Sequence, residues 1–555
     1  MNKFSALDRN KILRKIKTGT YDLLIIGGGI TGAGIALDAA SRGLKTILIE
    51  KGDFASGTSS KSTKLIHGGL RYLKQFEIAL VREVGSERAI VHKLAPHLVT
   101  SEKMLLPIIE DGTFGKILTA IGLMVYDVLA GVEKEEQRVM LDKEETMEIE
   151  PLLPEKILKG AGLYAEYRTD DARLTIEVLK TAMKYNTDAI NYVEATEFIY
   201  ENEQVTGIQA LDNISNETFQ IKAKHVVSAA GPWVDELRDL NHSKKGSRLH
   251  LTKGVHIVVP RAKLPIKNSI YFDVADGRMI FAIPRGKNTY VGTTDTTYHG
   301  DKNHVVTNSQ DAHYLLSAVN DMFPSINLTI NDVTSSWAGL RPLIHEEGKS
   351  ESELSRKDEI FESKTGLISI AGGKLTGYRK MAERLVDLVE KKYEKYTDKK
   401  LKKCFTDEIP LSGGIFKNAK EVRNYVDETA KKLAPYGFDR HDAKYLVFNY
   451  GRQTDSILEK FEALNDTDHE IRLAKAELWF TVNHEMVTSP LDFFVRRTGR
   501  LYFKIESITK IKTAILEEFK SIFNWNEQRL STAKKALEMM MYDVSDFNET
   551  TTRNH

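Results

Sequence analysis

The sequence predicts an α/β protein that opens with a dinucleotide-binding unit, continues into a second domain with a mixed sheet, and closes with a helical C-terminal part. Three observations support this prediction. A strand, a glycine turn, a helix, a second strand and an acid follow one another in LLIIGGGITGAGIALDAASRGLKTILIEKGDF, residues 23–54. Glycine-punctuated strands then mix with helices as far as residue 390 or so. From residue 415 to residue 545 the apolar residues recur at helical spacing.

The glycine turn has the spacing of a phosphate-binding loop. The apolar run Leu23 to Ile26 predicts a strand buried on both faces, and Gly27, Gly29 and Gly32 after it match G-x-G-x-x-G. The first glycine permits a tight turn, the second lets the backbone approach a pyrophosphate, and the third lets helix and strand pack closely. The helix that follows would direct its unpaired N–H groups and the positive end of its dipole at the phosphates.

Glu50 narrows the choice of cofactor. It ends the second strand, where an acid can accept hydrogen bonds from ribose hydroxyls. An acid at this position also disfavours a ribose 2′-phosphate, so NADP is the least favoured ligand. FAD and NAD both remain open at this point.

Three later segments favour FAD when they are taken together. A strand ends in SAAG at 228–231, another ends in AGG at 371–373, and the loop GTSSKSTKLIHGGLRYL at 57–73 carries hydroxyls and glycines. Each alone is typical of an ordinary turn. Together they fit a long cofactor that crosses the whole domain, as FAD does.

The composition of the chain argues against several other classes of function. The chain has 555 residues, which predicts two to four domains, and its formal net charge of +1 gives no reason to expect nucleic acid. Cys404 is the one cysteine, so an intramolecular disulfide and a cysteine metal cluster are excluded. The start has no continuous apolar core and is not expected to be a signal peptide. The longest apolar stretch, 117–131, is too short to span a bilayer and contains Asp127.

The expected domain boundaries follow these composition changes. We expect a basic N-terminal helix over 1–20 and a cofactor domain interleaved with a substrate domain over 21–395. The charged linker TDKKLKKC then leads into a helical C-terminal domain over 396–545, and residues 546–555 form a flexible tail.

Several longer motifs resemble those of one enzyme family. SSKSTKLIHGGLRYL, GPWV, KGVHIVVP, VGTTDT, AGLRPL and AGGKLTGYRKMAE, in this order, are similar to segments of the FAD-dependent (aerobic) glycerol-3-phosphate dehydrogenases. The likeness runs from about residue 20 to residue 385 and is looser in the helical part. It implies a Rossmann-like FAD-binding domain of the glutathione-reductase/D-amino-acid-oxidase type.

The resemblance also implies an activity. The expected reaction is oxidation of sn-glycerol 3-phosphate to dihydroxyacetone phosphate, with electrons passed to a quinone by a cytoplasmic protein held peripherally at the inner face of the cell membrane. A glycerol-3-phosphate oxidase that makes hydrogen peroxide is the main alternative. An amine or amino-acid oxidase and a non-enzymatic flavin- or lipid-binding module are further alternatives, and a homodimer is left open.

A phosphorylated polyol needs several cations around its phosphate, with arginine preferred for its bidentate geometry. The residues that we expect to bind substrate share basic or phenolic side chains within or near glycine-rich turns: Arg71, Tyr72, Arg341, Arg356 and Lys374. Arg341 is the strongest candidate, because it lies between a glycine and a proline in what the sequence suggests is a turn. The alternative for each cation is an ordinary surface ion pair, and for Arg356 the two interpretations are evenly balanced. LSR around Arg356 also departs from the family pattern.

The proposed catalytic residues are His256, Arg341 and Lys374. Oxidation of a secondary alcohol needs a proton acceptor with a pKa near neutrality, which favours histidine, and the family places the strand of His256 over the flavin ring. The alternative is a histidine with satisfied hydrogen bonds inside the sheet. Lys374 could also stabilise negative charge on the reduced cofactor, and Thr294 and Asp295 are expected to order the site.

The expected cofactor-binding residues lie in the glycine turn, the acid, the hydroxyl-rich loop and the two later strand ends. They are Gly27, Gly29, Gly32, Glu50, Thr58, Ser59, Ser62, Gly68, Gly69, Leu70, Ala230, Gly231, Gly373, Lys374, Leu375 and Thr376.

A peripheral membrane protein needs a surface that is both basic and apolar. One candidate is the N-terminal stretch, in which Phe4, Leu7, Leu13 and Ile16 could share a helical face. The other is the apolar stretch 114–131. The alternative for the first is a helix docked on the domain, and for the second a core helix.

Overall fold

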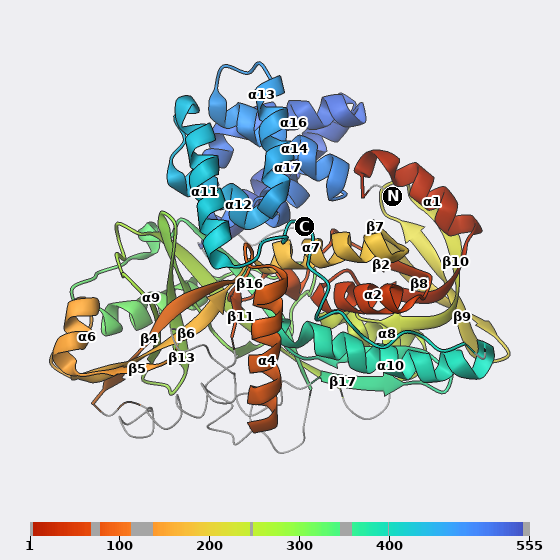
Figure 1. The fold of residues 1–555 in the computed structure, drawn as a ribbon, viewed down its shortest axis with the longest axis horizontal. Coiled ribbons are helices and arrows are strands. Elements are labelled where there is room, and N and C mark those ends of the chain that lie inside the picture. Colours follow the sequence, from red (N-terminus) through yellow and green to blue (C-terminus); the bar gives the residue numbers. More distant parts are fainter. Residues whose placement is uncertain are drawn as a thin grey trace.

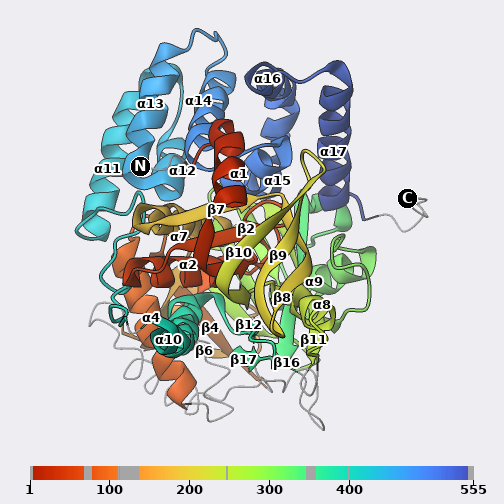
Figure 2. The same cartoon turned by 90° about the vertical axis from the view of Figure 1, so that its right-hand side faces the viewer.

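The computed structural model describes residues 4–67, 78–110, 112, 137–244, 248–344, 358–397 and 399–547. Figure 1 shows two sheet-containing regions side by side, with the C-terminal helices grouped above them. Figure 2 shows the same helices gathered on one side of the molecule. Within the described residues, each helix is too short or too polar to cross a lipid bilayer.

The first sheet belongs to the cofactor unit. Its central order is β17 (Asp358–Glu362), β18 (Ile368–Gly372), β10 (Glu217–Ser228), β1 (Thr20–Ile26), β2 (Thr46–Glu50) and β7 (Thr187–Asn191). Strands β18, β10, β1, β2 and β7 run parallel, so their carboxyl ends meet at one edge. The hairpin β8 (Val193–Glu201) and β9 (Gln204–Asp212) extends the sheet from the first half of β10.

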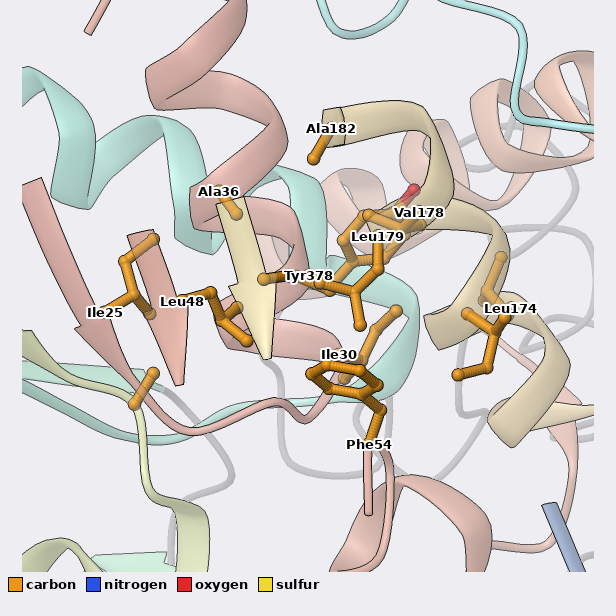
Figure 3. Close-up of a cluster of buried hydrophobic side chains, with 14 of the residues drawn as sticks. Ile25, Ile30, Ala36, Leu48, Phe54, Leu174, Val178, Leu179, Ala182 and Tyr378 are labelled. Atoms are coloured by element: carbon orange, nitrogen blue, oxygen red, sulfur yellow. The ribbon is translucent and has the colours of Figure 1, made fainter. Parts of the chain in front are cut away.

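Helix α2 (Ile30–Arg42) begins at Gly29 and ends where Gly43 adopts φ +114°. Its small residues serve close packing, because a Cβ at Gly34 would lie 2.8 Å from the ring of Tyr378 at the start of α10 (Tyr378–Thr397). Figure 3 shows Tyr378 among buried side chains from β1, β2, α2 and α7 (Asp171–Ala182). The predicted strand–turn–helix–strand unit is confirmed.

The second sheet is mixed, and it contains the strands of the predicted site residues His256 and Arg341. Its order is β15 (Thr296–Thr297), β11 (Leu249–Pro260), β14 (Asn288–Gly292), β13 (Met279–Arg285), β12 (Ser269–Asp273), β4 (Thr100–Ile109), β6 (Leu158–Arg168) and β3 (Leu65–Ile66). Strand β16 (Ser335–Ile344) pairs with β11, and β5 (Val139–Leu141) pairs with β6. Helices α4 (Ile78–Leu94), α6 (Lys143–Ile149) and α9 (Ser309–Met322) lie along the chain between strands of this sheet, whereas α8 (Val234–Leu240) packs against β18 of the first sheet.

The C-terminal part is helical, as predicted. Its helices are α11 (Ala419–Leu433), α12 (Arg440–Tyr450), α13 (Thr454–Ala463), α14 (His469–His484), α15 (Arg500–Phe503), α16 (Ile505–Phe523) and α17 (Glu527–Ser545). A separate apolar core holds α11 to α14 together. Helix α7 is buried along its whole length between this part and the cofactor unit.

The N-terminal helix α1 (Arg9–Thr18) is docked on the cofactor unit. Its apolar residues Ile12, Leu13 and Ile16 are buried, and so is Phe4 ahead of it. Arg9 donates hydrogen bonds to the backbone oxygen of Asn191 and to Asp212. Of the two interpretations of this stretch, the docked helix is therefore confirmed, because the residues of the apolar face pack inward.

Candidate functional site

The glycine turn lies at the carboxyl end of β1, where it meets the ends of β2, β10 and β18. Gly27 adopts φ +117°, and a Cβ there would lie 2.5 Å from the carbonyl oxygen of Ala229. A Cβ at Gly32 would lie 1.9 Å from the carbonyl oxygen of Gly27, so helix and turn leave no room for one. The nearest atom to a Cβ at Gly29 would be the Ser59 hydroxyl, at 3.0 Å. The chain is thus closely packed at the first and third glycines and open at the second.

The carboxylate of Glu50 accepts hydrogen bonds from the backbone at two places, at Gly28 in the glycine turn and at Gly52 after β2. One carboxylate oxygen accepts the Gly28 N–H at 2.7 Å and the other accepts the Gly52 N–H at 2.8 Å. Burial raises the pKa of Glu50, and the two backbone donors oppose that rise. Each oxygen keeps a second lone pair, so Glu50 can still accept a ribose hydroxyl.

A crevice runs from this turn across the ends of the strands. Among its lining are predicted cofactor residues from four segments of the chain, namely Gly27, Gly29, Glu50, Thr58, Ser59, Ser62, Ala230, Gly231, Gly373, Lys374 and Leu375. Gly32 and Thr376 do not line it: Gly32 packs against the turn, and the Thr376 hydroxyl donates to the backbone oxygen of His67 at 3.4 Å. Gly68, Gly69 and Leu70 lie outside the described residues.

This crevice suits a dinucleotide such as FAD. It offers the N-terminus of α2, open space over Gly29 for a phosphate, and an acid at the ribose position. The crevice also contains residues that the sequence did not reveal, Val193, Glu194, Ala195 and Trp233. Strand order could have indicated the first three, since they follow β7, whose carboxyl end lies beside that of β2.

The crevice reaches Pro342 of β16, the neighbour in sequence of Arg341. Arg341 lies within a strand and not in the turn that the sequence suggested. Its guanidinium covers Gly254, where a Cβ would lie only 2.3 Å from Nη2. Arg341 donates to the backbone oxygen of Thr294 at 3.0 Å and to the hydroxyl of Thr293 at 2.8 Å, and lies 3.2 Å from a carboxylate oxygen of Asp295. Thr294 and Asp295, which the sequence analysis expected to order the site, thus both contact the Arg341 guanidinium.

His256 lies on the same face of the sheet as Arg341. On β11 it stands opposite Trp337 of β16, and Arg341 lies four residues beyond Trp337 on β16, opposite Thr252. The imidazole stacks on the Trp337 ring, with centroids 4.8 Å apart and planes 11° apart. Its Nε2 lies 3.0 Å from the hydroxyl of Thr63, whereas Nδ1 is buried without a hydrogen-bond partner among the described residues.

The electrostatics of His256 differ from the expectation of a pKa near neutrality. Burial lowers its pKa well below 6.5, and the positive charges of Arg341 and Lys64 lower it further. The predicted near-neutral ionisation is therefore wrong for the protein without substrate, in which His256 is neutral. An arriving phosphate dianion would raise this pKa again, because opposite charge stabilises the imidazolium.

Lys64 and Trp337, which the sequence analysis did not identify, lie in the same group of side chains as His256. Lys64 is buried, lies 2.5 Å from Asp171, and has its ammonium 5.7 Å from the centroid of the Trp337 ring. Trp337 donates from Nε1 to the backbone oxygen of Ser62 at 3.1 Å, which fixes the hydroxyl-rich loop against the substrate sheet. Among the other predicted substrate residues, Lys374 lines the crevice. Arg71, Tyr72 and Arg356 lie outside the described residues.

Comparisons with known proteins agree with this geometry. Residues 22–379 match the family model described as FAD dependent oxidoreductase. Residues 404–530 match the model described as C-terminal domain of alpha-glycerophosphate oxidase.

Two curated relatives are similar over almost their whole length. The chain is 49% identical over 546 residues to the aerobic glycerol-3-phosphate dehydrogenase of Bacillus subtilis (strain 168), with 98% of each chain covered. It is 47% identical over 547 residues to the enzyme of that name from Staphylococcus aureus (strain USA300), again with 98% of each covered.

Solved structures are similar as well. The glycerol-3-phosphate dehydrogenase from Bacillus halodurans complexed with FAD superposes with a TM-score of 0.84 at 44% identity, over 99% of this chain and 100% of that one. The L-alpha-glycerophosphate oxidase from Mycoplasma pneumoniae shares the fold, with a TM-score of 0.55 at 21% identity over 70% of this chain and 97% of that one.

Proposed function

Because the chain belongs to the family of the FAD-dependent, aerobic glycerol-3-phosphate dehydrogenases, we propose that it oxidises sn-glycerol 3-phosphate to dihydroxyacetone phosphate. One observation carries the proposal. Strand β16 contributes Pro342 to the lining of the cofactor crevice, and the next residue along, Arg341, shares one face of the second sheet with the buried, neutral imidazole of His256. A cation to bind phosphate and a base to accept a proton are the two groups that this oxidation requires.

The mechanism assigns each residue one task. Arg341 binds the substrate phosphate, and the contacts from residues 293–295 hold it in place beforehand. His256 accepts the hydroxyl proton at Nδ1, while its Nε2 is oriented by the Thr63 hydroxyl. The Trp337 ring keeps the imidazole in one plane and excludes water from that side. FAD, when bound, supplies the acceptor of the hydride. Lys374 places positive charge in the crevice where the accepted electrons would be stabilised.

The natural electron acceptor is proposed to be a quinone in the membrane, and oxygen is the alternative. Anaerobic addition of glycerol 3-phosphate should bleach the yellow protein, whereas glycerol should not. Quinone reduction without peroxide would then support the dehydrogenase. A peroxide yield equal to the substrate consumed would identify an oxidase, and an unbleached flavin would refute the substrate.

A further inference from the structure

A second large cleft lies between the helical C-terminal part and the substrate sheet. It has a volume of about 1300 Å³, and it shares no lining residue with the cofactor crevice. One wall comes from α11, α12 and the start of α16, and the other from loops of the substrate sheet around residues 260–288. A cleft of this size exceeds the usual range for a small-ligand site, about 300–1000 Å³.

The lining of this interdomain cleft is strongly basic. Its acidic residues are largely neutralised already, since Glu102 pairs with Arg168, Asp170 with Arg285 and Asp442 with Lys504. The remaining cations have no carboxylate oxygen within 4.0 Å in the part of the chain that the structure describes. They are Arg261, Lys267 and Lys287 on the sheet wall, and Arg423 and Lys444 on the helical wall.

The two walls are close enough to influence each other. Lys444 is partly buried, and its pKa is lowered by burial and then by the charge of Arg168 on the opposite wall. Likewise, Lys287 on the sheet wall contributes to the lowered pKa of Asp439, at the start of α12. Although Glu102 opposes the shift of the Lys444 pKa, charges on one wall act on groups of the other, so an anion between the walls would be attracted by the cations of both.

The shape and the aromatic residues select among anionic ligands. A cleft is concave, so it does not suit the flat surface of a bilayer. Three aromatic rings of the lining already have a cation over them: Lys444 lies 5.0 Å from the Phe448 ring, Lys504 lies 5.0 Å from Tyr445, and Arg285 lies 4.0 Å from Phe503. No exposed ring among these three is left for stacking with bases, as single-stranded nucleic acid would require.

We propose that the interdomain cleft binds a small polyanion with two or more phosphate groups, which bridges the sheet wall and the helical wall. Arginine forks and lysine ammonium groups are the ligands that proteins use for phosphate. Several phosphates in one molecule match cations that are divided between two walls. This site is separate from the proposed substrate site, which receives a single phosphate.

The test is a calorimetric titration of the full-length, FAD-loaded protein with inorganic tripolyphosphate at low ionic strength. Excess glycerol 3-phosphate is present under anaerobic conditions, so that the proposed substrate site is occupied. We expect saturable binding with one site per chain that weakens as salt is added. Inorganic phosphate and citrate form parallel arms, and both should bind at least about tenfold more weakly, because neither carries several phosphates.

The decisive variant combines Lys287→Gln, Arg423→Gln and Lys444→Gln, which removes charge from both walls without breaking an ion pair among the described residues. Binding should weaken at least about tenfold, with an unchanged melting temperature in the absence of ligand. Lys431→Gln is the matched control, because Lys431 lies on α11 but does not line the cleft. If the triple variant has a lower melting temperature than the parent protein, the affinity of the single variant Lys444→Gln is compared with that of the parent instead. Unchanged affinity in these variants, no binding by the parent protein, or equal binding of citrate would overturn the proposal.

Discussion

At the scale of single residues, Arg341 is positioned before any ligand arrives. Gly254 leaves room for its guanidinium, and the backbone and hydroxyls of residues 293–294 fix its direction. A side chain that is already ordered loses little conformational entropy when it binds. Binding energy from the phosphate is therefore available to orient the hydroxyl that reacts.

We predict that Arg341→Ala lowers kcat/KM tens- to thousands-fold with unchanged flavin content, since losing such a contact costs about 2–5 kcal/mol. Arg341→Lys should recover only part of the loss, because the bidentate geometry is absent. Steady-state kinetics with flavin absorbance checks both. Arg278→Ala is a control, because Arg278 pairs only loosely with Asp276, at 3.6 Å on a distant turn. If the alanine variant still prefers glycerol 3-phosphate over glycerol as the parent does, phosphate recognition lies elsewhere.

Gly29 and Gly32 differ in what an added side chain would contact. A side chain at Gly29 would project toward the Ser59 hydroxyl and the open crevice, whereas one at Gly32 would collide with the backbone of Gly27. We predict that Gly29→Val folds but purifies colourless, because the valine occupies the pyrophosphate position. Gly32→Val should fail to fold. Circular dichroism and flavin absorbance distinguish the two, and full flavin content in Gly29→Val would contradict this assignment.

At the scale of elements, the helical C-terminal part holds the loop that follows β2. Asp53 of this loop is buried and forms ion pairs with Arg496 at 2.5 Å and Arg497 at 2.8 Å, both from the π-helix Asp492–Arg497. These arginines lower the pKa of Asp53 to about 2, against the effect of burial. The helical part thus braces the segment whose first residue, Glu50, supports the glycine turn.

We predict that Asp53→Asn destabilises the protein by about 3–5 kcal/mol, because two buried guanidinium groups lose the carboxylate that they share and keep only Asp492 and the more distant Glu485. Flavin should also dissociate more readily, since the loop loses its brace. Thermal unfolding and flavin release during dialysis are the measurements. Asp455→Asn on α13 is a control, because Asp455 makes an exposed ion pair with Lys432. Equal stability of the two variants would show that the brace has no energetic role.

The loop before β4 contains a buried histidine, His97, that makes the stability of the protein depend on pH. His97 packs against Phe416, and burial, with the charges of Arg173 and Lys180, lowers its pKa to about 3. Between pH 6.5 and about 3 the unfolded chain therefore binds a proton that the folded protein does not, so stability falls as pH falls.

We predict that His97→Leu makes the melting temperature less dependent on pH between 6.5 and 4, because the variant lacks this titration. Melting curves of the parent and the variant at several pH values test it. Parallel curves would show that His97 is not responsible for the loss of stability in acid.

At the scale of the whole molecule, the membrane surface remains a proposal. Of the two candidates, the N-terminal helix has its apolar residues buried against the domain, which is the docked alternative. The other candidate, 114–131, falls among residues that the structure does not describe.

We predict co-sedimentation with anionic liposomes that weakens at high salt, because part of the attraction is screened. Leu118→Asp should reduce binding if 114–131 forms the surface. Leu7→Asp should not, although Leu7 is 54% exposed, because it stands apart from a continuous apolar face. No sedimentation at low salt, together with stoichiometric peroxide, would favour a soluble oxidase.

The sequence was sufficient for the cofactor unit. The glycine spacing, the strand before it and Glu50 lie within one short segment, so local rules of turn geometry and helix ends apply directly. The ends of β10 and β18 could also be identified, because the residues after a buried parallel strand tend to face the ligand edge. Arg341 and His256 were identified through motifs, without their mutual geometry.

Only the tertiary structure decided the rest. It placed Arg341 in a strand above Gly254, stacked His256 on Trp337, and lowered the histidine pKa through burial and two cations. It also joined Asp53 to Arg496 and Arg497, more than 400 positions later. Burial and charge at a residue depend on every segment that packs around it, whereas a turn or a helix end depends on its immediate neighbours. Local sequence therefore specifies the cofactor turn, and long-range packing sets the chemistry beside it.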